Sequence, residues 1–383
     1  MVRIVGGAVS GVVLAAVLAA CTPTTASVPE KSRPSGEAMP GVVTSTVTRA
    51  QLGPGSTIVV ATNVRERGAP TSGLATSLEV VTPDGVRHPL WTVDLDEAGV
   101  DVDLADWRPE LRTALLRTTG DRGRDRAVAY DVTTGAARVV VLPRGAISVG
   151  LDPRGTGILM TLYGRDPFAR TVAQTWDGER TRLPGTGGYP MTSVDGRTLL
   201  SPAGDVSGWD VVDLATRRVE TSVTPPGSCS PIRWIDDDSV LTSCYAHGGN
   251  QLRAVHLGGG SRVLGPFHHV VAGRTGIISD GDTVRAGGTR WYLSESRRGV
   301  LTRGSPQGVT LVQGTTGIVH LARTPDGRLL LARSDNTLDE PSARAVLEVL
   351  DPRTRTRTVL VRLAPGQAWR SVIGATEVRP WNP

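Results

Sequence analysis

Two kinds of tight turn recur along this chain, and each stands beside a short run of apolar residues. The first kind is similar to Asp-x-x-Thr-Gly. Its aspartate bonds its own backbone and its glycine accepts a positive φ, so it favours a hairpin. It is found at residues 131–135, 213–217 and 351–355, with weaker equivalents at 84–85, 177–178, 258–259 and 296–297. These positions lie about 44 residues apart on average, which is the period of β-propeller blades.

The second kind of turn resembles Pro-Asp-Gly-Arg and precedes an apolar strand. It occurs at residues 152–155, 195–197, 237–239, 274–276 and 325–328, and more weakly at 108–110. A four-stranded blade needs one turn of each kind, so one blade lacks its second turn, and the C-terminal strand over 367–378 is left without a partner. We therefore expect residues 369–378 to supply the inner strand of the first blade, which leaves no open sheet edge.

This arrangement predicts an all-β, seven-bladed β-propeller in which the N- and C-terminal strands share one blade. The 46 Gly and 26 Pro among 383 residues are too many for a helical bundle, and 39% hydrophobic residues are too many for a disordered chain. A pair of β-sandwiches is the alternative fold, but such a pair would show no repeat of this length.

The start of the chain has the pattern of a secretory signal. Arg3 is followed by an apolar run over residues 4–20 that ends in Leu-Ala-Ala, directly before Cys21. A membrane-spanning helix is the alternative, although 17 residues with three glycines stand at the lower limit for a span. The sequence Leu-Ala-Ala-Cys resembles the lipobox of bacterial lipoproteins, which implies cleavage before Cys21 and lipids on that cysteine.

The residues after Cys21 are rich in Pro, Thr and Ser, and they predict a flexible tether that cannot bury a core. The expected organisation is a lipoprotein signal peptide over 1–20, the lipidated cysteine and tether over 21–52, and a propeller over 53–383. Such a protein would be exported and anchored by lipid to the outer face of the cell membrane.

Two further cysteines, Cys229 and Cys244, flank the acidic turn at residues 236–238. The midpoint between them falls inside that turn, so an antiparallel hairpin would place them opposite each other, within reach of a disulfide. An even number of remaining cysteines in an exported protein also favours a disulfide. Two free buried thiols are the alternative.

The sequence lacks local motifs of catalysis and metal binding. Gly-x-Ser-x-Gly, His-Glu-x-x-His and Cys-x-x-Cys are absent. His268 and His269 are adjacent in a predicted strand and point to opposite faces, and the acidic turn lacks the alternation of a calcium loop. The 42 Lys and Arg are interspersed with 37 Asp and Glu, without the basic cluster that nucleic acid requires. We therefore assign no catalytic residue, metal or cofactor, and we expect no nucleic-acid partner.

Trp107, Trp234 and Trp369 stand at the ends of predicted inner strands. Three aromatic rings near the mouth of a propeller channel are candidate platforms on which a sugar or peptide could stack. Packing between blades is the alternative, because large aromatic side chains fill the wedge-shaped space there.

The recurring Asp-Gly-Arg and Asp-x-x-Thr-Gly turns resemble those of the broad TolB-like and WD40-like propeller group of exported bacterial proteins. The resemblance implies the fold and a role in binding or scaffolding. We expect a membrane-anchored module that binds a protein or small ligand without catalysis. An exported hydrolase or lyase with a site at the central channel, and a sensor of cell-wall fragments or solutes, are the alternatives.

Overall fold

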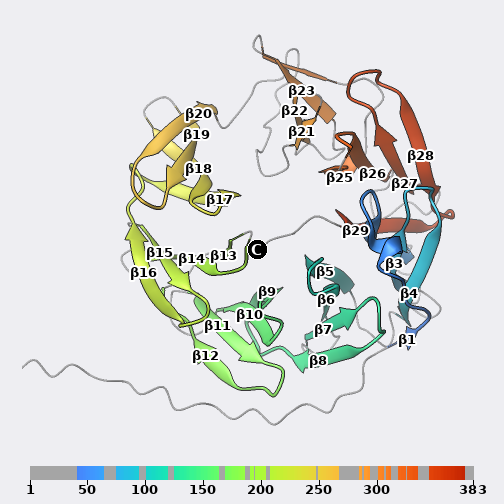
Figure 1. Ribbon diagram of the computed structural model, residues 1–383, viewed down its shortest axis with the longest axis horizontal. Helices are drawn as coiled ribbons and strands as arrows, with labels where there is room; N and C mark the ends of the chain where they lie inside the picture. The colour runs from blue at the N-terminus through green and yellow to red at the C-terminus, as the bar shows by residue number, and fades with distance from the viewer. Residues whose placement is uncertain are drawn as a thin grey trace, which may run out of the picture.

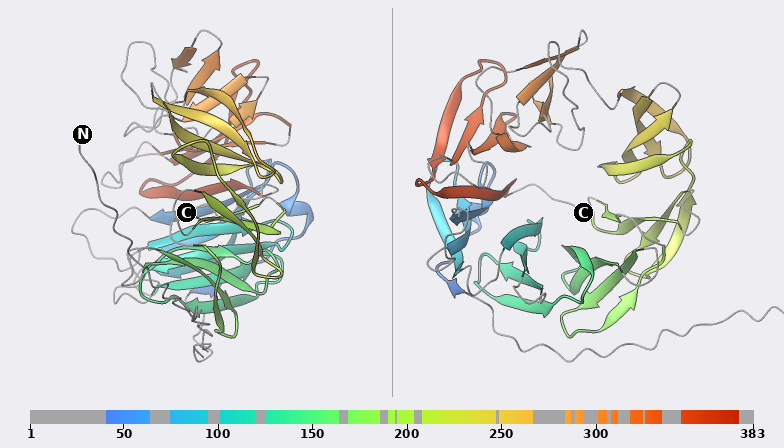
Figure 2. Two further views of the ribbon diagram at one scale, coloured as in Figure 1. Left: turned by 90° about the vertical axis from the view of Figure 1, so that its left-hand side faces the viewer. Right: turned by 180° about the vertical axis from the view of Figure 1, so that it is seen from behind.

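The computed structural model describes residues 41–63, 75–94, 101–119, 125–163, 169–185, 190–193, 195–203, 208–246, 249–266, 284–286, 289–293, 301–305, 308–311, 318–324, 326–334 and 345–375. Within these residues, antiparallel sheets stand radially around a central opening, each with one strand near the centre and one at the perimeter (Figure 1). The same ring is seen from behind in Figure 2. Such a ring of four-stranded sheets is a β-propeller, so the predicted all-β fold is confirmed.

The described strands form seven sheets, numbered here along the chain. Sheet 1 contains β1 (Val42–Val43), β2 (Thr57–Asn63), β3 (Ala75–Val81), β4 (Arg87–Asp94) and β29 (Gln367–Gly374), and the short 3-10 helix η1 (Ala50–Leu52) precedes β2. Sheet 2 contains β5 (Asp101–Arg108), β6 (Thr113–Thr119), β7 (Arg126–Asp131) and β8 (Ala137–Val141). Sheet 3 contains β9 (Ala146–Leu151), β10 (Gly157–Leu162), β11 (Arg170–Thr175) and β12 (Arg180–Arg182). Sheet 4 contains β13 (Met191–Thr192), β14 (Thr198–Pro202), β15 (Trp209–Asp213) and β16 (Arg218–Val223).

The remaining three sheets follow the same order from the centre to the perimeter. Sheet 5 contains β17 (Cys229–Asp236), β18 (Ser239–Ala246), β19 (Gly249–His256) and β20 (Ser261–Pro266). Sheet 6 contains β21 (Val284–Ala286), β22 (Thr289–Leu293), β23 (Leu301–Ser305) and β24 (Gly308–Leu311). Sheet 7 contains β25 (Ile318–Arg323), β26 (Leu329–Ser334), β27 (Ala345–Leu350) and β28 (Arg357–Arg362).

The C-terminal strand closes the ring within sheet 1. β29 pairs antiparallel with β2 from Thr57↔Gly374 to Asn63↔Gln367, and it lies next to the central opening (Figure 1). The predicted inner strand for the first blade is therefore confirmed in its place, although β29 begins at 367 and ends at 374. Backbone hydrogen bonds thus join the two ends of the folded chain.

The recurring aspartates act as backbone caps in the hairpin turns. Oδ1 of Asp131 accepts hydrogen bonds from the backbone N–H groups of Thr133 at 2.8 Å and Thr134 at 3.1 Å, and Gly135 follows with φ 73°. Oδ1 of Asp351 is bonded in the same way by the N–H group of Arg353 at 2.7 Å. These contacts are the turn chemistry that the sequence pattern predicts.

Sheet 6 departs from the predicted positions of its turns. The predicted turns at 274–276 and 296–297 lie outside the described residues. The hairpin between the third and fourth strands closes between Ser305 and Gly308 instead, and the hairpin of the first two strands closes between Ala286 and Thr289. Neither place carries the aspartate motif, so the turn pattern misplaced the strands of this sheet.

The propeller begins earlier than residue 53, the predicted boundary. β1 pairs with β4 through Val42↔Thr92 and Val43↔Trp91, as a fifth strand at the edge of sheet 1. Val47 is buried among the apolar side chains of sheets 1 and 2, and its N–H donates to the carbonyl of Val132 at 3.1 Å. Residues 41–52, assigned to the tether from composition, therefore belong to the folded unit.

The core is a series of apolar layers, each of them between two neighbouring sheets. The layer between sheets 1 and 2, for example, buries Trp91, Trp107 and Tyr130 completely. Because both faces of a blade are covered by its neighbours, the strands carry apolar runs more than strict alternation. Among the described residues, no helix has the length and hydropathy that crossing a membrane would require.

Candidate functional site

The three tryptophans proposed as stacking platforms are buried. Trp107 on β5, Trp234 on β17 and Trp369 on β29 are 0%, 4% and 5% exposed. They belong to three separate layers, between sheets 1 and 2, sheets 4 and 5, and sheets 7 and 1. Burial this complete leaves no ring face on which a ligand could stack. Packing between blades, the alternative, is what the structure shows for all three.

Cys229 and Cys244 form a disulfide between the paired strands β17 and β18, with 3.9 Å between their Cα atoms. The hairpin turn lies one residue later than the expected midpoint, because Asp236 pairs with Ser239. Two irregularities in β17, at Ile232 and Ile235, restore the register so that the cysteines still face each other.

Several sequence candidates lie outside the described residues, namely Cys21, His268 and His269. The acidic turn at 236–238 is described and exposed, and the N–H group of Asp238 donates to Oδ1 of Asp236 at 3.0 Å. Within the described part of the chain, His, Cys, Asp and Glu side chains form no group of three that could hold a metal ion.

The turn aspartates are held ionised by the hydrogen bonds that they accept. Burial raises the pKa of Asp152, but bonds from Arg154 and Thr156 outweigh burial, so the pKa lies below its ordinary value. The pKa of Asp131 is lowered by its threonine neighbours against the same effect of burial. A carboxylate whose lone pairs are occupied in this way stabilises a turn.

A buried ion pair on β5 links the inner strands of three sheets. The side chains of Asp106 and Arg108 are both 0% exposed, with 3.5 Å between Oδ2 of Asp106 and Nε of Arg108. Nη2 of Arg108 donates to Oγ1 of Thr192 on β13 at 2.9 Å, and Oδ2 of Asp106 accepts from N–H of Leu151 on β9 at 2.8 Å. The sequence offered no signal for this pair, because charged residues near a strand end resemble ordinary solvated positions.

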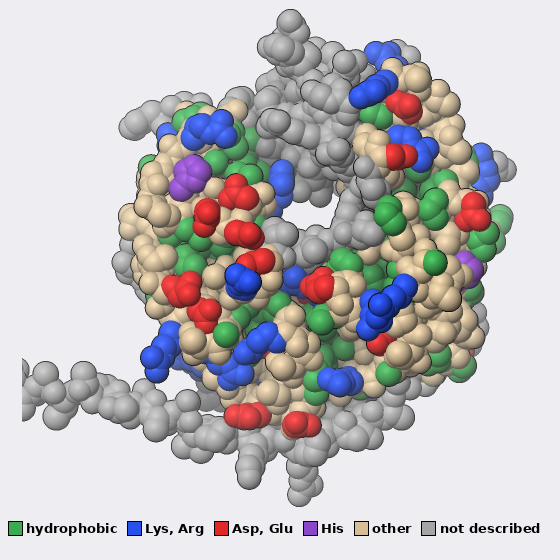
Figure 3. All heavy atoms as spheres, in the orientation of Figure 1, with side chains coloured by type: hydrophobic (Ala, Val, Ile, Leu, Met, Phe, Trp, Pro, Cys, Tyr) green, Lys and Arg blue, Asp and Glu red, His purple; other side chains and the backbone are tan. Residues whose placement is uncertain are grey.

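The face shown in Figure 3 carries acidic and basic side chains together around the central opening. Acidic side chains gather at the left of this view, over sheets 4 and 5, where the exposed turn between β17 and β18 lies. Arginines stand close by on the same face, so no single sign of charge dominates it.

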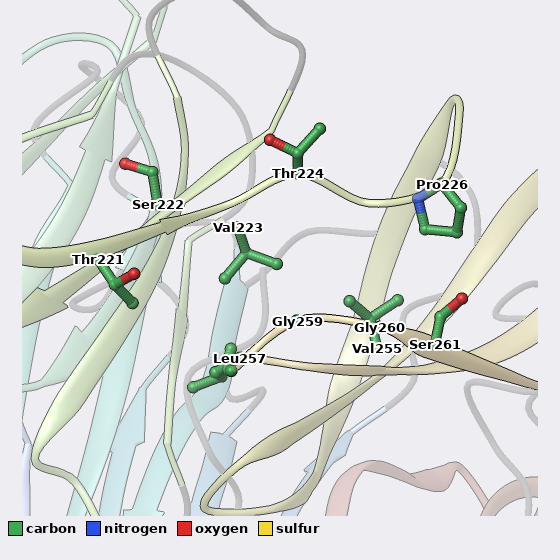
Figure 4. Close-up of a pocket in the computed structure, with 11 residues that line it drawn as sticks. Thr221, Ser222, Val223, Thr224, Pro226, Val255, Leu257, Gly259, Gly260 and Ser261 are labelled. Carbon is green, nitrogen blue, oxygen red and sulfur yellow. The ribbon is translucent and has the colours of Figure 1, made fainter.

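A groove of about 350 Å³ lies at the perimeter between sheets 4 and 5 (Figure 4). We call it the perimeter groove. Its lining is Thr221, Ser222, Val223, Thr224, Pro226, Val255, Leu257, Gly258, Gly259, Gly260 and Ser261. The side chain of Val223 points toward Leu257 and the glycine turn, whereas Ser222 and Thr224 project away (Figure 4). The groove thus has an apolar base, hydroxyl groups at its rim and no charged lining residue.

A turn of three glycines borders the perimeter groove. Gly259 and Gly260 have φ 104° and 83° in the turn between β19 and β20, a conformation that glycine adopts without strain. A Cβ atom added at Gly258, Gly259 or Gly260 would meet nothing within 4 Å. The run of three glycines was read from the sequence as a turn alone, so its contribution to a groove was missed.

No protein-family model matches this chain, and no curated protein matches it. Solved structures share its fold. Dihydro-heme d1 dehydrogenase NirN in complex with DHE is 13% identical, with a TM-score of 0.50 over 90% of this chain and 77% of that chain. TolB from Acinetobacter baumannii is 14% identical, with a TM-score of 0.37 over 88% of this chain and 89% of that chain. The β-propeller domain of the Trilobed protease from Pyrococcus furiosus is 11% identical, with a TM-score of 0.41 over 68% and 93%. The first of these similarities, with a TM-score of 0.50, shows the fold alone, which proteins of different functions share.

Proposed function

We propose that this chain is an exported lipoprotein whose seven-bladed propeller binds an extended segment of another protein. In this proposal, lipids on Cys21 hold it on the outer face of the cell membrane. The lipobox pattern supports the anchor, and the Cys229–Cys244 disulfide supports export, because disulfides persist in oxidising compartments. β1 fastens the chain that follows the tether to the outer edge of sheet 1.

The observation that carries the binding role is the perimeter groove beside the edge of β16. Among the described strands, β16 pairs with β15 alone, and its side chains from Arg218 to Ser222 are exposed. An open strand edge offers backbone N–H and C=O groups to an added strand. An extended peptide along β16 would place alternate side chains in the groove next to it.

The molecule itself shows that an outer edge can accept such a segment. β1 is added to β4, the outermost of the sheet's four regular strands, through Val42↔Thr92 and Val43↔Trp91. The uncharged lining of the perimeter groove favours small or apolar side chains in the partner segment. The partner is therefore expected to present an extended, uncharged stretch of chain.

Site-specific photocrosslinking in native membranes tests the binding role. A photoreactive residue replaces Thr221, which is exposed and lines the groove, or Thr358, which is exposed on the outermost strand of sheet 7. A crosslinked partner is expected at 221 and not at 358, and Thr221→Arg should weaken capture where Thr358→Arg does not. Equal crosslinking at both positions, or none at 221 in folded protein, would contradict the proposal.

The anchor is tested separately by cell fractionation of the intact chain and of Cys21→Ala. The intact chain is expected in the membrane fraction, with a mass that shows lipid on its N-terminal cysteine. Cys21→Ala should carry no lipid and keep its apolar segment over 4–20 uncleaved, because the lipobox is lost. It should keep its fold, because residue 21 precedes the described propeller. Intact protein that carries no lipid would refute the anchor while leaving the groove experiment valid.

A further inference from the structure

A second cavity, of about 440 Å³, lies where the N-terminal segment meets sheets 1 and 2. Arg49 and Leu52 border it from the N-terminal side, beside η1. Pro109, Glu110 and Arg112 border it from the turn between β5 and β6. Trp107 and Ala375 complete the wall, and the indole N–H of Trp107 donates to the carbonyl of Ala375 at 3.0 Å. The volume is within the range of small-molecule sites.

Arg112 occupies a backbone position that other sheets give to glycine. Its φ is 53°, and its N–H closes the turn on the carbonyl of Pro109 at 3.2 Å. The equivalent turns of sheets 3, 4 and 7 are closed by Gly155, Gly196 and Gly327, with φ 71°, 72° and 84°. A side chain in this left-handed conformation is uncommon. At this position the arginine side chain lines the cavity, whereas a glycine would contribute no side chain to it.

The cavity is bordered by three charged side chains, those of Arg49, Glu110 and Arg112. Among the described residues, the side chains of Arg49, Glu110 and Arg112 make no hydrogen bond or ion pair with one another or with any other residue. Other half-buried arginines of the described residues do form ion pairs, as Arg87 does with Glu79 and Arg117 with Asp125. Two unpaired guanidinium groups and one carboxylate leave the cavity with a net positive charge.

We propose that this cavity binds a small organic anion with an apolar body. Arg49 and Arg112 would hold its carboxylate or phosphate, because guanidinium groups bind planar oxyanions with paired hydrogen bonds. Leu52 and Pro109 would contact the apolar body, and Trp107 lies buried behind them. Sheets 1 and 2, which border the cavity, lie across the ring from sheets 4 and 5 (Figure 1). The inference does not depend on the proposed partner.

Ligand-observed NMR with phenylacetate and phenylacetamide tests this site, because the two probes differ in charge and share their shape. Phenylacetate is expected to bind the intact propeller, and phenylacetamide to bind about tenfold more weakly, the effect of one charge-assisted contact. Arg112→Gly should weaken phenylacetate by a similar factor. Glu110→Gln should strengthen it, because this change removes the one negative charge at the cavity.

Arg355→Gly is the matched control. Arg355 also has a positive φ, of 62°, in an exposed turn of sheet 7, and it does not line the cavity. Both glycine variants should fold and melt at or above the temperature of the parent protein, so a loss of binding in Arg112→Gly alone is not a loss of folding. Equal affinity of Arg112→Gly and the parent, equal affinity for the two probes, or no binding of phenylacetate at millimolar concentration would each overturn the proposal.

Discussion

Replacement of Arg108 by methionine should strongly destabilise the propeller, because it removes one charge of a completely buried ion pair. Methionine has a similar length and no charge, so the variant removes the cation and leaves the space largely filled. Asp106 then remains with its side chain 0% exposed and without the guanidinium 3.5 Å away. Thr192 also loses the hydrogen bond from Nη2 at 2.9 Å.

Removal of one partner of a buried ion pair costs about 3–5 kcal/mol, because the remaining charge loses its opposite charge at a place that water does not reach. The double variant Asp106→Leu/Arg108→Met removes both charges. It still loses the bond from Arg108 to Thr192 and the acceptor of the Leu151 N–H group at 2.8 Å. A buried donor left unbonded in this way costs about 1–3 kcal/mol. The double variant is therefore expected to be more stable than Arg108→Met alone.

Urea unfolding followed by tryptophan fluorescence measures these differences, and a double-mutant cycle gives the coupling between the two residues. The control is Arg328→Met. Arg328 pairs with Asp326 at 2.6 Å, but the two side chains are 44% and 53% exposed, so its loss should cost less than about 1 kcal/mol. If Arg108→Met costs no more than Arg328→Met, or if the double variant is the least stable of the three, the reasoning from burial is refuted.

Three further predictions concern cross-linking, pH and the N-terminal segment. Reduction of the Cys229–Cys244 disulfide, which closes a separation of 15 residues, should lower the free energy of unfolding by about 3 kcal/mol, and urea unfolding with and without reductant should show the difference. The pKa of Asp152 is lower in the folded protein than in the unfolded chain, where it is about 3.9. Its ionised carboxylate therefore stabilises the fold fully above that unfolded-state pKa, and this stabilisation is lost as the pH falls through the folded-state pKa. Asp152→Asn should therefore flatten the acid unfolding curve, and an unchanged curve would argue against this role. A chain that begins at residue 53 should lose about 2 kcal/mol relative to one that begins at 41, because Val47 is 3% exposed, and calorimetry would show whether it melts at a lower temperature.

Much of the fold was predictable because turn chemistry is local. An aspartate that caps its own backbone and a residue with positive φ need only a few neighbouring residues, so the turns at 131–135, 213–217 and 351–355 could be found without knowledge of the rest. Their spacing of about 44 residues matched the period of propeller blades. The surplus strand at the C-terminus then indicated that β29 must pair with β2.

The functional candidates were harder to predict because they depend on contacts between sheets. Arg108 donates a hydrogen bond to Thr192, 84 residues away. Nothing in the sequence around either residue indicates that the two are in contact. The perimeter groove joins the end of β16 to the turn after β19, and each segment alone reads as an ordinary turn or edge. The tryptophans failed as markers of a site because the property that suggests stacking, a large apolar ring, also favours burial.

Arg112 shows how a local departure from a repeated turn can indicate function where composition does not. A residue with a Cβ in the left-handed conformation costs roughly 1–2 kcal/mol relative to an ordinary conformation, and glycine avoids this cost at the equivalent positions in sheets 3, 4 and 7. Arg355 carries the same backbone cost at an exposed turn, so a positive φ by itself does not identify a binding residue. What distinguishes Arg112 is that its turn borders a cavity shared with Arg49 and Glu110. Arg112→Gly should be more stable than the parent protein and bind the anion less tightly, whereas Arg355→Gly should be more stable with unchanged affinity. That result would mean that the backbone strain at position 112 is retained for binding.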